Sequence, residues 1–219
     1  MLSEPSSPTL LTHRKREAIL QAAISEFRAH GFAGTSMDRV AAVAEVSKRT
    51  VYNHFPSKDE LFAAILTQLW QRAQGLLAVA YNPQKALRTQ LLDCLEQKMR
   101  LLNDSSFLDR SRVAIAEMMQ SPQRAQAMVA RLAEKEEGLV TWIRAAQLDQ
   151  RLRADVDPQY AADQLQGMVK SFAFWPQLAL GQPPLEAVQQ QRVLADCVDM
   201  FLGFYAARAQ EIPAQKAIK

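Results

Sequence analysis

Glycine, cysteine and long apolar runs are scarce in this sequence, and each scarcity excludes a class of structure. Only 7 of the 219 residues are glycine, and no glycine-rich phosphate loop is found. The two cysteines, Cys94 and Cys197, form neither a CxxC pair nor a Cys/His cluster, which argues against structural zinc. No apolar run approaches the ~20 residues that span a membrane, and the N-terminus lacks the apolar core of a signal peptide. We expect a cytoplasmic protein with two buried thiols and with no membrane span, metal or cofactor.

The residues that are abundant favour helix. Alanine, leucine and glutamine are common, hydrophobic residues make up 48% of the chain, and β-branched residues are sparse. No segment shows a competing strand pattern. At 219 residues the chain is long enough for one large domain or two smaller ones, and its net charge of +3 is too small to indicate nucleic acid. The sequence therefore predicts an all-α protein with about nine helices.

Capping residues place the helix boundaries. Apolar residues at helical spacing predict a first helix over His13–His30, with Gly31 as its C-cap. Thr35 opens a short second helix, Ser47 opens a third, and a capping box at Ser57 begins a longer one. A helix, then two short helices joined by a tight turn, make a helix-turn-helix unit. Later helices are expected over 83–103, 106–120, 122–149, 158–180 and 185–208.

The stretch Ser47–Phe55 is the most informative part of the chain. It reads as a short helix capped by Ser47, with Lys48 and Arg49 in its first turn. A helix N-terminus carries a partial positive charge, so each cation there costs roughly 0.3–1 kcal/mol. Lys58 occupies the same unfavourable position in the next helix. An anion lying against these helices would make the interaction favourable, so the sequence indicates a unit that meets phosphate.

This region resembles the TetR family of bacterial transcriptional regulators, and in particular its AefR-like branch. The resemblance is carried by Ile19-Leu20-Gln21-Ala22-Ala23, Phe27, Gly31-Phe32, Thr35-Ser36-Met37, Val40-Ala41, Ala44, Val46-Ser47-Lys48, Thr50-Val51-Tyr52-Asn53-His54-Phe55 and Ser57-Lys58-Asp59-Glu60-Leu61-Phe62. It implies an N-terminal three-helix, helix-turn-helix domain that binds DNA, and a C-terminal helical domain for ligand binding and dimerisation. We expect a tail over 1–12, the DNA-binding domain over 13–60, the second domain over 61–208 and a tail over 209–219.

One position departs from the family pattern. The turn between the two short helices needs a left-handed residue, for which the family usually has glycine, but this chain has Glu45. A non-glycine residue there costs on the order of 1 kcal/mol. We therefore expect slight strain at this turn, together with a negative charge near the DNA face that reduces non-specific affinity.

The second helix of a helix-turn-helix motif enters the major groove with its N-terminal residues facing base edges. Lysine or arginine can read guanine, asparagine can read adenine, and a threonine methyl can meet thymine. The candidates for base contact are Lys48, Arg49, Thr50 and Asn53. The resemblance implies phosphate contacts for Thr35, Tyr52, His54 and Lys58. Taken alone, Tyr52 would fit a half-buried aromatic equally well, and His54 would fit a structural histidine.

The resemblance also implies a homodimer, whose two recognition helices read a palindromic operator in double-stranded DNA. It assigns dimerisation to the last two helices as a four-helix bundle. The apolar residues of 158–180 and 185–208 fit this arrangement, and a core within one chain is the alternative explanation for them.

Regulators of this family usually enclose a ligand pocket in the second domain. Methionines and aromatics there suit an adaptable pocket and an ordinary core equally well. The candidate lining residues are Trp70, Met99, Met118, Met119, Met128, Trp142, Phe172 and Trp175. No buried charged triad stands out, so we expect a small ligand that is apolar or weakly polar.

Together these features predict a dimeric, nucleoid-associated repressor that a small apolar ligand releases from its operator. The alternative is a DNA-binding regulator without such a ligand, which a protein partner or its own abundance controls. Enzyme activity is not expected, because the sequence has no nucleophile elbow, no metal-ligand spacing and no paired carboxylates in an apolar helix. Asp104, Asp109 and Glu117 are better explained as charged helix surface.

Overall fold

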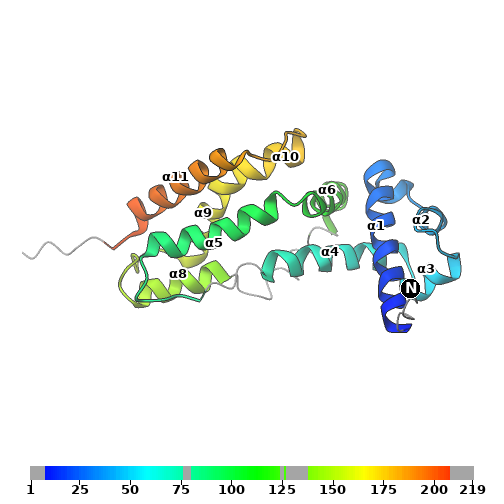
Figure 1. Cartoon of the computed structure of the whole chain (residues 1–219), viewed down its shortest axis with the longest axis horizontal. Helices are drawn as coiled ribbons and strands as arrows, with labels where there is room; N and C mark the ends of the chain where they lie inside the picture. The colour runs from blue at the N-terminus through cyan, green and yellow to red at the C-terminus, as the bar shows by residue number, and fades with distance from the viewer. Residues whose placement is uncertain (1–7, 76–79, 124–125, 127–137, 208–219) are drawn as a thin grey trace, which may run out of the picture. The chain divides into compact units, whose positions relative to one another are not determined.

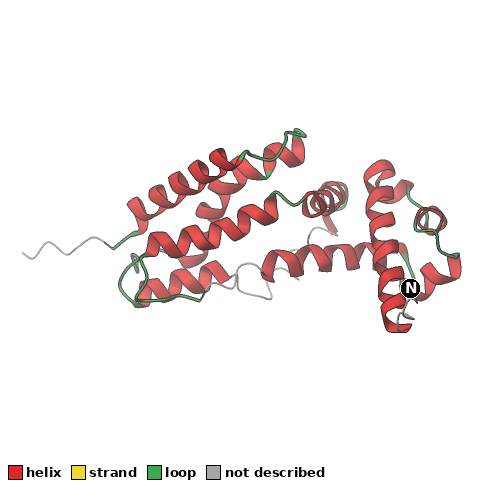
Figure 2. Cartoon of the chain, viewed as in Figure 1, coloured by secondary structure: helices red, strands yellow, loops and turns green. Residues whose placement is uncertain are grey.

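The structure is a computed structural model that describes residues 8–75, 80–123, 126 and 138–207. The regular elements in these residues are all helices (Figure 2), so the all-α prediction is confirmed. An isolated antiparallel bridge joins Leu152 to Ala206. None of the helices in the described ranges is long and apolar enough to cross a bilayer.

The chain folds into two compact units that alternate along the sequence. The described residues of the first unit fall within Met1–Gly75, Arg100–Lys135 and Phe174–Pro184, and those of the second within Leu76–Met99, Glu136–Ala173 and Leu185–Lys219. The first unit contains α1 (Pro8–Gly34), α2 (Met37–Val43), α3 (Lys48–His54), α4 (Lys58–Gly75), α6 (Ser105–Gln120) and α10 (Trp175–Ala179). The second contains α5 (Leu87–Leu102, up to Met99), α8 (Gly138–Leu148), α9 (Pro158–Ala173) and α11 (Ala187–Tyr205). Figure 1 traces the helices in chain order.

The core of the first unit is built from the apolar faces of α1 to α4. Ile19, Leu20, Val40, Val51 and Leu61 are fully buried in it. Because α2 and α3 both pack against α1, the apolar core determines which side of each short helix faces outward.

An aromatic cluster closes this core beside Gly31. The rings of Phe27 and Phe32 stack at 5.5 Å, and both meet Phe62 of α4 edge-on. Gly31 has φ 68°, a left-handed conformation that ends the regular part of α1 at the residue expected from the sequence. The helix starts at Pro8, which is earlier than the expected His13.

In the second unit α9 packs between α8 and α11. Leu139 and Ile143 of α8, Leu165 and Val169 of α9 and Phe201 of α11 are buried. Cys94 and Cys197 are free and buried, as expected. Burial raises the pKa of both thiols, so they stay protonated and unreactive.

Several later helices also have bounds that differ from those expected. The helix expected over 158–180 ends at Ala173, and Phe174 has non-helical φ −133° and ψ −60°. Pro176 accounts for this break, because it has no N–H to donate to the carbonyl four residues earlier and its ring crowds that carbonyl. The helix expected over 83–103 starts instead at Leu87, after a turn in which the side chain of Asn82 accepts from the N–H of Gln84. Of the helix expected over 122–149, residues 124–125 and 127–137 lie outside the described residues, and α8 forms its last part.

The turn between α2 and α3 has the geometry expected from the sequence. Glu45 has φ 54°, and the N–H groups of Glu45 and Val46 donate to the carbonyls of Ala42 and Ala41 at 3.2 and 3.1 Å. This left-handed closure is one that glycine adopts without strain and glutamate does not.

Replacing Glu45 by glycine should therefore raise the free energy of unfolding by about 1 kcal/mol. Chemical denaturation measures the change. Ala44→Gly is the matched control, because Ala44 has right-handed φ −78° and glycine at such a position loses stability. Destabilisation by both variants would show that the turn holds no strain.

Candidate nucleic-acid interface

The orientation of α3 follows from its apolar residues and its cap. Val51 is fully buried and Phe55, the C-cap residue, is 3% exposed. At the other end Ser47 is the N-cap, and its hydroxyl accepts from the N–H of Thr50 at 3.1 Å. The helix is therefore anchored at both ends, and its remaining side faces solvent.

Three residues proposed for DNA contact share that outward side. Arg49, Tyr52 and Asn53 are exposed, and their spacing of three and four residues places them on one face of the helix. Tyr52 is 47% exposed, so it is half-buried and part of its side chain is open to solvent. The face thus presents a guanidinium, a phenol and an amide side by side, all of which can donate to base edges or phosphate oxygens.

Lys48 begins α3, and an acidic residue of α2 faces it. Its Nζ lies 2.6 Å from Oδ2 of Asp38. Both side chains are more than half exposed, so the pair adds little stability. Asp38 nevertheless offsets the unfavourable dipole interaction that the sequence suggested for Lys48. Nothing in the spacing of these two residues would have identified them as partners.

Thr50 and His54 are half-buried. The hydroxyl of Thr50 lies 2.8 Å from that of Ser47, within the helix cap. The ring of His54 lies 6.3 Å from that of Phe55. Both residues border the outward face of α3 rather than forming its centre.

Thr35 and Lys58 make their contacts inside the protein. Thr35 is 3% exposed, and its hydroxyl donates to the carbonyl of Gly31 at 2.8 Å. The Nζ of Lys58 donates to the carbonyls of Phe32 and Thr35 at 2.7 and 3.0 Å, and it lies 4.5 Å from the centre of the Phe32 ring. Lys58 therefore fastens the start of α4 to the loop between α1 and α2.

Two polar residues near Thr35 were missed by the sequence reasoning. Ser36 is exposed and is the actual N-cap of α2, where its hydroxyl accepts from the N–H of Arg39 at 3.2 Å. Arg39 is about half exposed, with its Nε 2.9 Å from Oε2 of Glu26. The capping preference of serine was a readable signal for Ser36, whereas the side-chain partner of Arg39 is not local in sequence.

The first part of α1 contains four consecutive basic residues, His13 to Arg16, and one of them contacts the end of α3. The guanidinium of Arg16 lies 5.0 Å from the centre of the Phe55 ring, a favourable cation–π arrangement. Arg14 and Lys15 are exposed. Arg14 and Lys15 are thus open to solvent, and the neighbouring Arg16 packs on the end of α3.

The residues proposed for a ligand pocket occupy different environments. Met99 and Trp142 are buried in the second unit, and the indole N–H of Trp142 donates to Oε1 of Gln90 at 3.2 Å. Phe172 of the same unit is half exposed.

In the first unit Trp70 and Met118 are half-buried, Trp175 is 48% exposed and Met119 is 82% exposed. Met128 lies outside the described residues. Met99 and Trp142 are thus the fully enclosed members of the described set. Among the residues that the structure describes, no group of three or more His, Cys, Asp or Glu side chains is arranged to hold a metal ion.

Comparison with known protein families gives two matches. Residues 19–65 match the family described as bacterial regulatory proteins, tetR family. Residues 89–207 match the AefR-like transcriptional repressor, C-terminal domain. The chain belongs to the TetR family. TetR-family proteins are DNA-binding transcriptional regulators and not enzymes, and the second match is to a repressor.

Individual TetR-family proteins support this assignment. A TetR family transcriptional regulator from Pseudomonas syringae pv. tomato str. DC3000 is 51% identical, and its crystal structure has a TM-score of 0.81 over 89% of this chain and 98% of that chain. The flavonoid-responsive regulator FrrA is 26% identical, with a TM-score of 0.67 over 90% of this chain and 100% of that chain. The HTH-type transcriptional regulator RutR of Escherichia coli (strain K12) is 29% identical over 174 residues, which are 75% of this chain and 76% of that protein.

The contacts of Lys58 generate a prediction for this TetR-family fold. Lys58→Ala should lower the free energy of unfolding by about 1.5–3 kcal/mol, because it leaves the carbonyls of Phe32 and Thr35 without their charged donor. Thermal and urea unfolding of the full chain measure the loss.

Lys15→Ala is the control for this experiment, because it removes a cation from an exposed position of α1. If the two variants unfold alike, Lys58 does not fasten the loop, and its ammonium is available to phosphate.

Proposed function

We propose that this TetR-family repressor acts as a cytoplasmic homodimer that reads a palindromic operator and leaves it when a small molecule binds. The observation that carries the DNA-binding part is the outward face of α3. Arg49, Tyr52 and Asn53 lie exposed on this face, and Val51 and Phe55 anchor the opposite side of the helix in the core. A helix held in this way can enter a major groove as a rigid unit.

Within this proposal the polar residues have different roles. Lys48, Arg49 and Asn53 contact base edges, with the methyl group of Thr50 at the margin. Tyr52 and His54 contact phosphate. Thr35 and Lys58 hold the loop between α1 and α2, as their internal hydrogen bonds favour.

The dimer is proposed to form through α9 and α11. Most of the apolar residues expected at that interface, including Leu165, Val198 and Phe201, are buried within the single chain, in agreement with the alternative of an intramolecular core. The exposed apolar side chains of α11 are different ones, and Met200 and Phe204 are 57% and 59% exposed. A partner chain that covers these two residues would remove apolar surface from water.

Two glycines on the exposed sides of α9 and α11 would allow the helices of a partner chain to approach closely. Gly203 lies beside Met200 and Phe204 on the exposed side of α11, and Gly167 lies on the exposed side of α9. A Cβ atom at either position would meet nothing within 4 Å in the single chain. Each glycine costs its helix about 1 kcal/mol relative to alanine, and the close approach of a second backbone gives a reason for that cost.

The ligand part of the proposal rests on the family and on the interior of the second unit. FrrA, which is described as flavonoid-responsive, aligns along this chain at 26% identity. In the second unit Lys98 of α5 and Gln166 of α9 are buried and hydrogen-bonded to each other. These polar groups within an apolar interior favour a ligand that is largely apolar but carries a hydrogen-bond acceptor. Such a compound should bind more weakly when operator is present, because release requires different affinities for the two states.

Binding-site selection from a random duplex pool tests the DNA-binding proposal. The wild type should select a palindrome with half-sites about 34–36 Å, or a multiple of that, apart. Lys48→Ala and Asn53→Ala should each relax base preference at defined positions by about 1–3 kcal/mol per base pair. Lys85→Ala, at an exposed position before α5, should select the same sequence as the wild type. An unchanged sequence preference in both α3 variants would contradict the assignment of base contacts.

The proposed interface predicts that Phe204→Glu and Met200→Glu give monomers, because a carboxylate cannot be buried there without a partner. Sedimentation velocity measures the oligomeric state, and operator affinity should fall with it. Leu148→Glu is the control, since Leu148 is 81% exposed on α8 and should remain dimeric. Dimers from the two α11 variants would place the interface elsewhere.

A further inference from the structure

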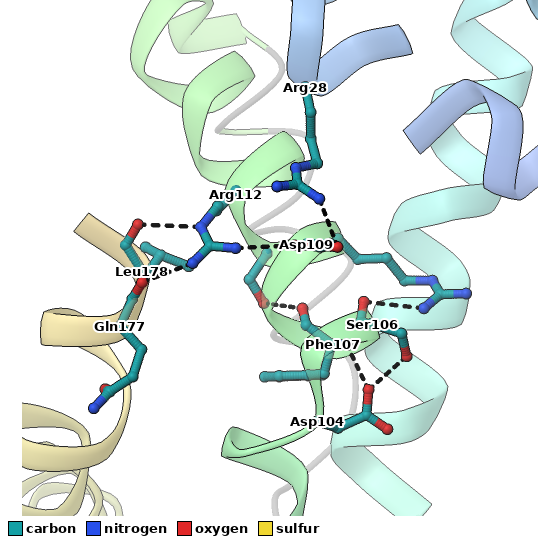
Figure 3. A network of polar contacts seen from close by, with 10 residues as sticks. Arg28, Asp104, Ser106, Phe107, Asp109, Arg112, Gln177 and Leu178 are labelled. Atoms are coloured by element: carbon teal, nitrogen blue, oxygen red, sulfur yellow. Dashed lines mark hydrogen bonds and ion pairs between the residues drawn. The ribbon is translucent and has the colours of Figure 1, made fainter. Parts of the chain in front are cut away.

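Arg112 of α6 uses all three nitrogens of its guanidinium in hydrogen bonds (Figure 3). Its Nη2 donates to the carbonyl of Gln177 at 2.7 Å, and its Nε donates to the carbonyl of Leu178 at 3.3 Å. Its Nη1 lies 2.9 Å from Oδ1 of Asp109, one turn earlier in α6. The side chain is about one-third exposed, so it is ordered by these contacts rather than extended into solvent.

The two carbonyls belong to α10, and they need such a donor. The last four carbonyls of a helix have no partner within the helix, and α10 is only five residues long. The N–H groups of Leu180 and Gln182 both donate to the carbonyl of Pro176. Arg112 supplies donors to the next two carbonyls, those of Gln177 and Leu178. It therefore caps α10 with a positive charge at the end where the helix dipole favours one.

Asp109 connects this cap to α1. Its Oδ1 accepts from Arg112, and its Oδ2 lies 2.6 Å from Nη1 of Arg28. One carboxylate thus lies between two guanidinium groups that come from α6 and α1 (Figure 3). Asp109 is 28% exposed, and screening by solvent is weaker there than on an open surface. This role cannot be identified from the sequence, because Asp109 fits the pattern of an ordinary charged helix surface.

A separate contact between the same two helices does not involve α10. Arg110 is 4% exposed at its side chain, donates to the carbonyl of Ser106 at 3.0 Å and lies 3.5 Å from Oε1 of Glu17. Packing of α6 on α1 and this ion pair therefore remain when Asp109 or Arg112 is changed. A substitution at Arg112 removes the connection to α10 without removing the α1–α6 contact as a whole.

We infer that Arg112 and Asp109 are positioning residues, which transmit the placement of α10 to α1 through Arg28. The chain leaves α9 at Ala173 and enters α10 at Trp175, so α10 is the helix that follows α9 directly in the chain. A change in α10 would withdraw or turn Arg112, and Asp109 would then bind Arg28 alone. The consequence for operator affinity rests on the proposed function, whereas the link between α10 and α1 does not.

Amide hydrogen exchange of the full-length protein without DNA tests the link itself. Arg112→Gln should accelerate exchange in α10 and also in the second half of α1, around Arg28, by at least about threefold. Arg112→Lys keeps the charge but not the forked geometry, so it should give an intermediate effect. Arg88→Gln is the matched control, because it breaks the two-bond Arg88–Asp199 pair of the second unit and should leave α1 and α10 unchanged.

Two exchange results would overturn the inference. One is unchanged protection of α1 in Arg112→Gln, which would show that the cap of α10 has no influence on α1. The other is equal acceleration in α5, α8 and α9, which would show general destabilisation in place of a directed link. If Arg112→Gln does not fold, Asp109→Asn replaces it with the same expectation for α1.

The second measurement is affinity for the operator selected by the wild type. Arg28→Gln and Arg112→Gln do not contact each other, so independent effects would multiply. The link predicts instead that the factor by which Arg28→Gln lowers operator affinity is at least about threefold smaller in the Arg112→Gln background than in the wild type. Multiplicative effects would overturn the inference. If the wild type selects no DNA at all, the proposed function fails, and the exchange experiment still decides whether the link exists.

Discussion

Neither α2 nor α3 can hold its shape alone, because each has seven residues and isolated helices shorter than about 12–15 residues are marginal in water. Their conformation depends on burial of Val40, Val51 and Phe55 against the longer helices. The same burial determines which residues of α3 face outward. The polar face of α3 that we propose for DNA contact therefore owes its geometry to apolar packing on the opposite side, and a loss of that packing would weaken DNA binding.

The parts of this fold that could be predicted are those with local signals. The serine caps at Ser36 and Ser47, the left-handed Gly31 and the left-handed turn at Glu45 each depend on a few neighbouring residues, and the sequence identifies most of them. Ser36 is harder to identify as the cap, because the adjacent Thr35 offers the same chemistry. The break before α10 also has a local signal, since Pro176 cannot continue a helix, although the apolar periodicity runs across it.

The parts that could not be predicted depend on residues far apart in the chain. Lys58 finds its carbonyl acceptors 23 to 26 residues earlier, and Arg112 finds two of its acceptors 65 and 66 residues later. Residue type gives no guide to such partners. It also does not reveal burial, because Met99 is enclosed while Met119 is open to solvent, although both are methionines in helices. Residue type alone therefore does not identify which methionines and aromatics line an enclosed interior.

The ion pair between Lys48 and Asp38 has a consequence for how binding should be measured. Affinity of a protein for DNA falls with added salt because each phosphate that is neutralised releases a condensed counterion. Lys48 has the carboxylate of Asp38 beside it, and in the proposed complex that carboxylate would stay near the DNA. An interface with such a pair would release fewer counterions from the DNA than the number of its lysines and arginines suggests. The number of lysines and arginines that touch the duplex would then be underestimated by thermodynamic titration with salt, and only a structure of the bound state would count them correctly.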